Sequence, residues 1–308
     1  MKTIYDRLLI LLLIPALAGC RYTFDIRDNG LEPCICLMSY ICADSLSNIS
    51  VYKTVPVQMT GKADMNLISP SYSLKSNGKE VDITSEDIDN FGIGLSCGTF
   101  KEGDRLELTF SADGMDKVTA STTVPGRFPE YLVQSYVDAN NTDCIRITYE
   151  DDGKTDDYYA VAMEIREKVM LREDKFIYRY SFADPTEDQN DLRIELYAYS
   201  PIVCQFNGAT LFIWADSDEE DGTYDLKYSR STVSQSIERA VRFHLYKLSR
   251  EMYYHLYADY DSSYNPFSDI GFSSPSFAYT NVMKGCGYFC AYSERQSDWI
   301  IVNKEEEE

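Results

Sequence analysis

Cys20 is the residue whose position most clearly implies chemistry. It follows Leu17-Ala18-Gly19, and a short apolar run from Leu8 to Ile14 lies ahead of it, preceded by two basic residues. This order is typical of a bacterial secretory signal that is cleaved before a cysteine, which then carries lipid. We therefore expect residues 1–20 to be a lipoprotein signal peptide and Cys20 to be the lipidated first residue of the mature chain. The apolar run is well short of the roughly 20 residues that a membrane-spanning helix needs.

The other cysteines could form disulfides, because an exported protein meets an oxidising compartment. Cys34 and Cys36 would share one face of a strand, where direct pairing is geometrically poor. We expect each to meet a partner on a neighbouring strand or to be a small buried residue. The sequence has no CxxC pair, which disfavours a structural zinc site. The possible disulfide cysteines are Cys34, Cys36, Cys42, Cys97, Cys144, Cys204, Cys286 and Cys290.

The two histidines, His244 and His255, lie in an alternating strand pattern and on a predicted helix. A catalytic triad or a common zinc site needs further partners around such a residue, and the local sequence offers none. We expect both histidines to be structural or exposed. The sequence also has no nucleophile elbow, P-loop or dinucleotide-binding fingerprint, so it predicts no catalytic residues, no metal site and no cofactor.

Two acidic segments could bind a cation. Asp216, Asp218, Glu220 and Asp221 precede Gly222, but an EF-hand has its glycine at the sixth position and glutamate at the twelfth. Here Gly222 is seventh and Lys227 is twelfth, so an acidic hairpin tip is the preferred interpretation. Residues 151–157, with four aspartates around Gly153, are interpreted as a turn first and a cation site second.

The net charge of −21 bounds the partners of this chain. Nucleic acid is excluded, because binding it depends on Lys and Arg neutralising phosphates. Contact with anionic lipid is expected through the lipid anchor alone. A length of 308 residues suggests two domains or one large β domain, and a composition with 44% hydrophobic residues suffices for a core.

The first half of the chain predicts short strands. Asn77-Gly78 supplies the two positive-φ residues of a type I′ turn, so Ser71–Leu74 and Val81–Ile83 are expected to form a hairpin. Alternation from Leu106 to Phe110 places three apolar side chains on one face. After a tether at 21–30, residues 31–126 are expected to form an immunoglobulin-like β-sandwich that ends at Pro125-Gly126.

Residues 127–303 are expected to form a larger strand-rich domain with one helix, so the whole protein is predicted to be all-β. Strands are predicted around many of the 25 tyrosines. Ser249 is a good N-cap, and a helix near 249–262 would place Met252, Tyr253, Leu256, Tyr257 and Tyr260 against the domain's sheet. Residues 304–308 are expected to be an acidic tail.

Several segments together form a recognisable signature of turn and packing residues. They are Leu248–Leu256, Asn265-Pro266-Phe267, Thr280-Asn281-Val282, Gly285–Phe289, Gly103-Asp104, Ala120–Pro125 and Asp218–Gly222. With these segments the chain resembles a Bacteroidetes lipoprotein family catalogued as domain of unknown function 4249, over nearly the whole mature chain. The chain departs from the family pattern in its many cysteines and in a Ser-rich loop at 272–277.

The resemblance implies an outer-membrane lipoprotein, often encoded beside TonB-dependent transporters, and brings no catalytic residues with it. We therefore expect a non-catalytic accessory or binding component of such a transport system, anchored to the outer membrane on its cell-surface or periplasmic face. The alternatives are a surface glycan- or peptide-binding module that uses Tyr residues or Trp214, an adhesin that exchanges strands, and a hydrolase whose carboxylates meet in the fold.

Overall fold

The computed structural model describes residues 32–55, 65–88, 92–137, 139, 143–151, 153–172, 175–183, 192–196, 202–216, 223–230, 238–264 and 279–304. The predicted signal peptide, Cys20, the tether, the motif at 265–267 and residues 305–308 lie outside these ranges. The chain divides into two units, Met1–Pro33 with Val55–Asp64, and Cys34–Thr54 with Met65–Glu308. Almost everything described belongs to the second unit.

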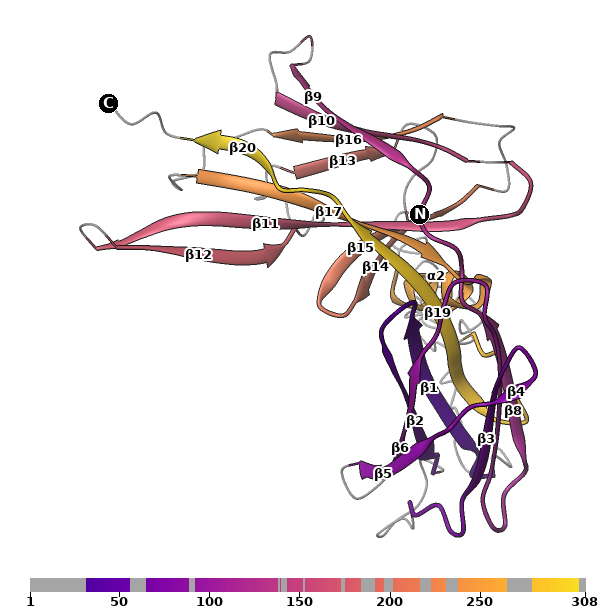
Figure 1. The fold of residues 1–308 in the computed structure, drawn as a ribbon. Helices are drawn as coiled ribbons and strands as arrows, with labels where there is room; N and C mark the ends of the chain where they lie inside the picture. Colours follow the sequence, from indigo (N-terminus) through magenta and orange to yellow (C-terminus); the bar gives the residue numbers. More distant parts are fainter. Residues whose placement is uncertain are drawn as a thin grey trace, which may run out of the picture. The chain divides into compact units, whose positions relative to one another are not determined.

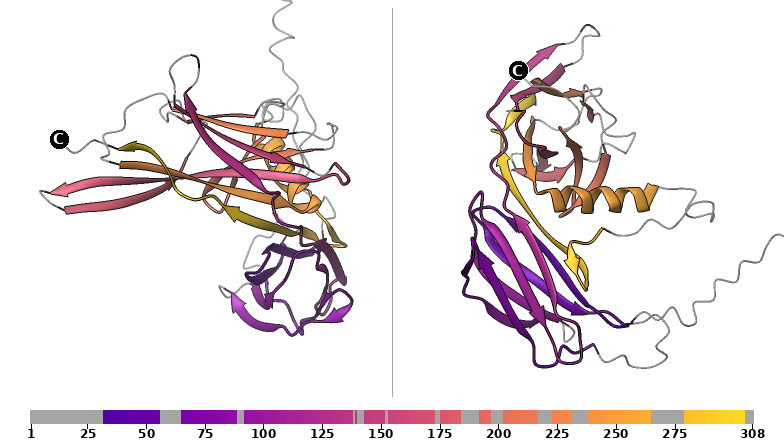
Figure 2. Two further views of the ribbon diagram at one scale, coloured as in Figure 1. Left: turned by 45° about the horizontal axis from the view of Figure 1, so that its top comes forward. Right: turned by 90° about the vertical axis from the view of Figure 1, so that its right-hand side faces the viewer.

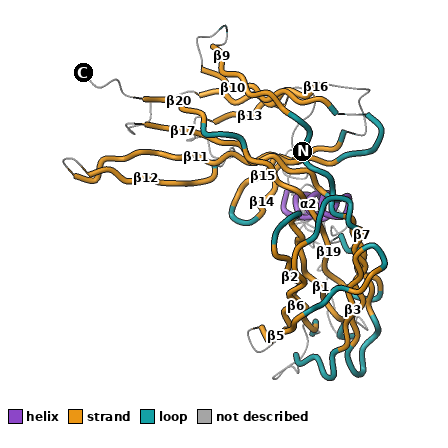
Figure 3. Tube along the Cα trace, in the orientation of Figure 1, coloured by secondary structure: helices purple, strands orange, loops and turns teal. Residues whose placement is uncertain are grey.

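The described residues are dominated by strands, as the sequence predicts, so the protein is all-β (Figure 3). Sheet A has eleven strands in the order β14-β15-β11-β17-β19-β1-β2-β6-β5, with β12 added beside β11 and β20 beside β17. Sheet B has the order β18-β8-β7-β3-β4, and sheet C the order β13-β16-β10-β9 (Figure 1). The strands of sheet A are β1 (Ile35–Cys42), β2 (Leu46–Lys53), β5 (Thr84–Ile88), β6 (Gly92–Thr99), β11 (Tyr158–Arg172), β12 (Lys175–Phe182), β14 (Ile202–Phe206), β15 (Ala209–Ala215), β17 (Glu238–Leu248), β19 (Cys286–Gln296) and β20 (Ile300–Lys304). Those of sheets B and C are β3 (Ser71–Ser76), β4 (Lys79–Glu80), β7 (Arg105–Ser111), β8 (Val118–Thr123), β18 (Val282–Met283), β9 (Tyr131–Val137), β10 (Asp143–Glu150), β13 (Leu192–Leu196) and β16 (Thr223–Arg230).

The first hydrophobic core lies between sheet B and the β1-β2-β6 part of sheet A. Leu106, Leu108 and Phe110 of β7 are buried in it, as their alternation predicts. Leu37 and Val51 enter the same core from the facing strands. These residues form a β-sandwich, while the finer expectation of an immunoglobulin-like topology stays a prediction.

The turn at Asn77-Gly78 is confirmed, with φ of 52° and 77°. The returning strand is wrong in its position: β4 covers only Lys79 and Glu80, and 81–83 is not a strand. Val81 instead donates its backbone N–H to the carbonyl oxygen of Leu74 at 2.9 Å as the chain leaves the sheet. A favourable turn therefore starts the hairpin but does not set its length.

Strand β11 has two buried faces, which explains its apolar first half. Tyr159, Val161 and Met163 pack on the face that β10 of sheet C also covers. Ala160 and Ala162 point the other way, into a third cluster that includes side chains of the helix. Small residues on this second face leave room for the helix to approach the sheet.

The helix is α2 (Arg250–Tyr264), close to the predicted range (Figure 2). Ser249 caps it, with its Oγ accepting the N–H of Met252 at 3.2 Å. Met252 and Leu256 are buried in the third cluster, as expected. Tyr257 is not, because its side chain is 44% exposed, so the apolar face is narrower than predicted. Among the described helices none has the length and apolar character needed to cross a membrane.

Strand β19 belongs to two neighbourhoods of sheet A. Its first half pairs in parallel with β1, from Cys36 opposite Cys286 to Cys42 opposite Tyr292. Its second half pairs antiparallel with β17, from Tyr292 opposite Leu248 onward. Strand β19, near the end of the sequence, therefore lies beside β1, the first described strand, in the middle of sheet A.

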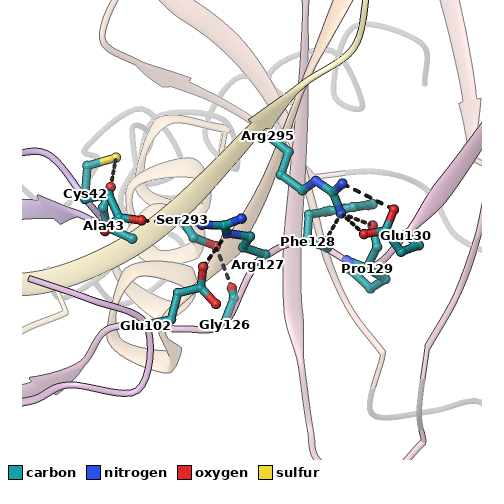
Figure 4. Close-up of polar contacts among 11 residues, drawn as sticks. Cys42, Ala43, Glu102, Gly126, Arg127, Phe128, Pro129, Glu130, Ser293 and Arg295 are labelled. Atoms are coloured by element: carbon teal, nitrogen blue, oxygen red, sulfur yellow. Dashed lines mark hydrogen bonds and ion pairs between the residues drawn. The ribbon is translucent and has the colours of Figure 1, made fainter.

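The segment around the predicted domain boundary at residue 126 is bound to the second half of β19 (Figure 4). Ser293 Oγ donates to the Gly126 carbonyl oxygen at 2.5 Å. The Arg295 guanidinium donates to the carbonyl oxygen of Phe128 at 3.1 Å and pairs with Glu130 at 3.0 Å. The chain after Gly126 is therefore held by specific hydrogen bonds, and the boundary itself stays a prediction.

Candidate functional site

Three of the predicted disulfide cysteines lie together where β1 meets β19. Cys34 Sγ is 3.5 Å from Cys286 Sγ, and Cys36 lies directly opposite Cys286 in the parallel register. The expectation that Cys34 and Cys36 each meet a partner on a neighbouring strand therefore leads to one shared partner. The remaining five lie outside this group: Cys97, Cys144, Cys204 and Cys290 are buried and Cys42 is half-buried.

The three thiols differ in the direction in which their pKa values are shifted. A hydrogen bond from Cys286 lowers the pKa of Cys36, although burial opposes this. The same hydrogen bond, together with burial, raises the pKa of Cys286. Burial also raises the pKa of Cys34. The hydrogen bond from Cys286 therefore favours the thiolate form of Cys36 over that of its two neighbours.

A second group brings together the two acidic segments that the sequence shows separately. Asp151 and Asp157, on either side of the turn before β11, meet Asp216, at the end of β15, with carboxylate oxygens within 4.8 Å of one another. Asp216 is buried, and its Oδ1 accepts the backbone N–H of Asp157 at 2.6 Å. Residues 217–222 lie outside the described ranges. We call Asp151, Asp157 and Asp216 the aspartate cluster.

A lysine and a tyrosine, neither of which the sequence analysis identified, complete the surroundings of the aspartate cluster. Lys247 Nζ of β17 donates to Asp157 Oδ2 at 2.5 Å, and the hydroxyl of buried Tyr159 donates to Asp151. Three carboxylates at this spacing could ligate a hard cation such as Ca²⁺. The Lys247 ammonium already supplies a positive charge at the same place, so the geometry is that of an ion-paired cluster joining strand ends.

Burial raises the pKa of Asp216 to about 6, and the neighbouring Asp151 and Asp157 add to the effect. Since the folded-state pKa lies above the unfolded one, the native state binds more protons between about pH 4 and 6, and stability falls as the pH rises through that window. Asp216→Asn keeps the acceptor for the Asp157 N–H without the charge. In urea titrations, we expect this variant to have a free energy of unfolding roughly 1–2 kcal/mol higher than the parent at pH 7, where the parent must bury a charge. At pH 4, where Asp216 is protonated in the folded parent, the free energy of unfolding should differ little between the two proteins.

Asp156→Asn is the control for this experiment, because Asp156 is exposed in the same turn. It should leave the unfolding free energy unchanged at both pH values. A loss of stability in Asp216→Asn at pH 7 would show that the ionised form is the favoured one in the folded protein.

Both histidines contact neighbouring polar side chains in the fold. His244 is buried between Glu294, 2.7 Å from its Nδ1, and Glu164, 3.1 Å from its Nε2. Burial raises the pKa of Glu294, but hydrogen bonds from His244 and Gln296 outweigh it and lower the pKa. These groups lie on the shared face of β11, β17 and β19, where they stabilise one another.

His255 of α2 lies on the Tyr288 ring, with ring centroids 4.1 Å apart, and its Nε2 is 2.8 Å from the Tyr40 hydroxyl. Burial lowers its pKa. The histidine therefore joins the helix to β1 and β19 in neutral form at physiological pH.

Trp214, which the glycan- or peptide-binding alternative would use if it were exposed, is buried. Trp214 is 8% exposed and donates its Nε1–H to the Tyr149 hydroxyl at 2.9 Å. Exposed aromatic rings instead lie on β12, where Phe176, Tyr178 and Tyr180 face outward. Periodicity alone could not locate them, because Tyr-rich strands occur throughout this half of the chain.

Four of the segments that carry the family resemblance, at 120–125, 248–256, 280–282 and 285–289, meet in one place. Asn281 accepts the N–H of Phe289 at 2.9 Å and donates to the Phe289 and Ser121 carbonyl oxygens at 2.8 and 3.1 Å. Ser249 exchanges backbone and side-chain hydrogen bonds with Ala291 while it caps α2. Gly285 and Gly287 allow β19 to lie against the backbone of β1. These residues join β18 and β19 to β8, β1 and the helix.

Comparison with known proteins bears on the family resemblance. A family model described as domain of unknown function (DUF4249) matches residues 21–298. No curated protein matches the chain. The resemblance inferred from the signature segments is thereby confirmed, and the chain belongs to the DUF4249 family.

Proposed function

We propose that this protein is a lipoprotein anchored to the outer membrane through Cys20, and that it is a non-catalytic accessory or binding component of a TonB-dependent transport system. The signal sequence before Cys20 and the genomic association that the family resemblance implies support the anchor and the kind of partner. In the described residues, the histidines and the aspartate cluster engage in structural hydrogen bonds and ion pairs. Their arrangement favours a role through contacts.

The observation that carries this proposal is the β11–β12 hairpin. Every residue of β12 from Lys175 to Ser181 is exposed, although four of them are aromatic or aliphatic. Tyr178 and Tyr180 are 50% and 58% exposed. Tyr and Arg are among the residue types that most often dominate the energetics of protein interfaces. We call Phe176, Tyr178 and Tyr180 with Arg166 and Trp299 the contact face.

The chemistry of the contact face favours a protein over a glycan. The Arg166 guanidinium lies 5.3 Å from the Tyr178 ring centroid and 4.9 Å from that of Trp299. Arg242 lies 4.7 Å from the same Trp299 ring. Sugar stacking needs an uncovered ring face, whereas interleaved Arg and aromatic groups suit the mixed polar and apolar surface of a protein partner.

Affinity purification of the intact chain from its own envelope tests the proposal. The parent protein should recover a TonB-dependent transporter. Tyr178→Ser combined with Tyr180→Ser should reduce recovery about tenfold or more, because each truncated ring removes apolar contact area. Met283→Ser, at a 67% exposed position on β18, is the matched control and should recover as much partner as the parent.

Repeated recovery of the protein alone would count strongly against the proposal. Binding to a glycan array that the Tyr178→Ser/Tyr180→Ser variant loses would favour the glycan-binding alternative instead. Mass spectrometry of the purified mature protein checks the anchor, which should add lipid to Cys20. Protease treatment of intact cells would show which face of the outer membrane the chain occupies.

A further inference from the structure

The outer edge of β12 is an unpaired strand edge among the described strands. β12 pairs with β11 from Phe182 opposite Glu164 to Lys175 opposite Arg172, and no other described strand pairs with it. In Figure 1 the hairpin extends beyond the neighbouring end of β17. A long exposed strand edge presents backbone N–H and C=O groups that another extended segment can pair with.

The side chains of β12 differ between its two faces. Phe176, Tyr178 and Tyr180 alternate on one face, beside the cations of β11. Lys175, Ile177 and Arg179 alternate on the other face. An added strand would therefore present every second residue to aromatic rings and the residues between them to cations.

Lys175 and Arg179, the cations of this second face, are available to pair with carboxylates of a partner. Within the described residues, no ion pair involves Lys175 or Arg179, whereas Arg166 is paired with Glu238 at 3.1 Å and Arg239 lies 3.5 Å from Glu167. Both lie on an exposed strand of a chain whose net charge is −21. Unpaired cations on a pairing edge attract opposite charge across the strands.

The same positive charges disfavour the pairing of β12 with the β12 of a second copy of this chain. Antiparallel pairing of β12 with its own copy would place two Lys175 and two Arg179 side chains on one face without a carboxylate from β12 itself. Like charges across neighbouring strands destabilise the pairing. Lysine and arginine on an edge strand discourage self-association in this way.

We propose that the free edge of β12 binds an extended acidic segment of a partner protein as an added β-strand. Backbone hydrogen bonds to β12 hold the segment, acidic residues of the segment pair with Lys175 and Arg179, and alternate apolar residues contact Phe176, Tyr178 and Tyr180. This proposal rests on the proposed function, since it gives the mode of contact at the hairpin.

The experiment uses the full mature chain and a fluorescent synthetic peptide that alternates Glu with Val and Tyr. Anisotropy titrations should show binding at least about tenfold tighter than that of the same peptide with Lys in place of Glu. An N-methylated form of the acidic peptide keeps the side chains but lacks half of its backbone donors. It should lose binding at least about tenfold, because strand addition depends on those donors.

A charge reversal on the protein supplies the matched comparison. Lys175→Glu combined with Arg179→Glu should reverse the preference, so that the Lys peptide binds more tightly than the Glu peptide. Lys101→Glu combined with Lys117→Glu changes the net charge equally at exposed positions on other parts of the chain and should leave the preference unchanged.

The results also separate this proposal from the proposed function. Equal binding of the Glu and Lys peptides, equal binding of the N-methylated peptide, or no binding of any peptide would overturn the strand-addition mode. If a TonB-dependent transporter is still recovered in those cases, the proposed function stands and the edge of β12 is not its contact. If the acidic peptide binds as expected but no transporter is recovered, the edge proposal stands and the assigned partner is wrong.

Discussion

Replacing Gly287 with alanine should destabilise the folded protein by at least about 3 kcal/mol, the largest effect expected of any single substitution considered. Gly287 has a φ of 92°, and a Cβ there would overlap the Leu37 carbonyl oxygen and lie 3.1 Å from Cys36 Sγ. The obstacle is backbone, so no side-chain rotation can relieve it. Either β19 moves away from β1 or the residue abandons its conformation.

Gly114→Ala separates strain from overlap in this experiment. Gly114 has a similar φ of 75°, but no heavy atom lies within 4 Å of the position that an added Cβ would take. The Gly114→Ala variant should have a free energy of unfolding about 1 kcal/mol lower than the parent, because alanine is strained in the left-handed conformation. Urea unfolding of both variants measures the difference. Equal losses would mean that β1 and β19 separate readily, and that their parallel pairing contributes little to stability.

A disulfide between Cys34 and Cys286 is the second large effect. When the protein matures in an oxidising compartment, we expect this bond to form, because the two sulfurs lie 3.5 Å apart. Cys34 directly precedes β1, and Cys286 is the first residue of β19. Reduction should lower the free energy of unfolding by about 3 kcal/mol, the middle of the range that protein disulfides usually contribute. Unfolding with and without a thiol reductant measures the change.

Three single variants test which cysteines take part. Cys286→Ala and Cys34→Ala should remove the response to reductant, while Cys36→Ala should keep it. Non-reducing peptide mapping should find the Cys34–Cys286 link in the parent and in Cys36→Ala. A reductant response that disappears in Cys36→Ala and survives in Cys34→Ala would assign the bond to Cys36 instead. Eight titratable thiols in the oxidised mature protein would rule out both.

Local patterns predicted most of the fold. Alternation located β7 because one face of that strand is buried and the other meets water, and Ser249 located the start of α2 through its capping side chain. The pattern was less informative where it depended on distant partners. The composition of Val81–Ile83 predicts a strand, but strand β4 ends at Glu80.

The candidate site was harder to predict because its residues come from separate segments. Asp151 and Asp157 appeared as one turn and Asp216 as part of another, and nothing in their spacing indicated that the ends of β11 and β15 would bring them together. Lys247 is a plain strand lysine in sequence. It becomes a partner of the aspartate cluster through the pairing of β17 with β11.

The sequence by itself determined the properties that local chemistry encodes: the strand-dominated composition, the acidic charge and the family signature. It also carries the pattern before Cys20 from which a signal peptide is predicted. The tertiary structure alone decided that Cys34, Cys36 and Cys286 share one place, that β19 completes the sheet begun by β1, and that the outer edge of β12 has no described partner. The physical reason is that strand periodicity assigns a residue to a face, whereas the neighbour across that face is chosen by pairing between segments far apart in the chain.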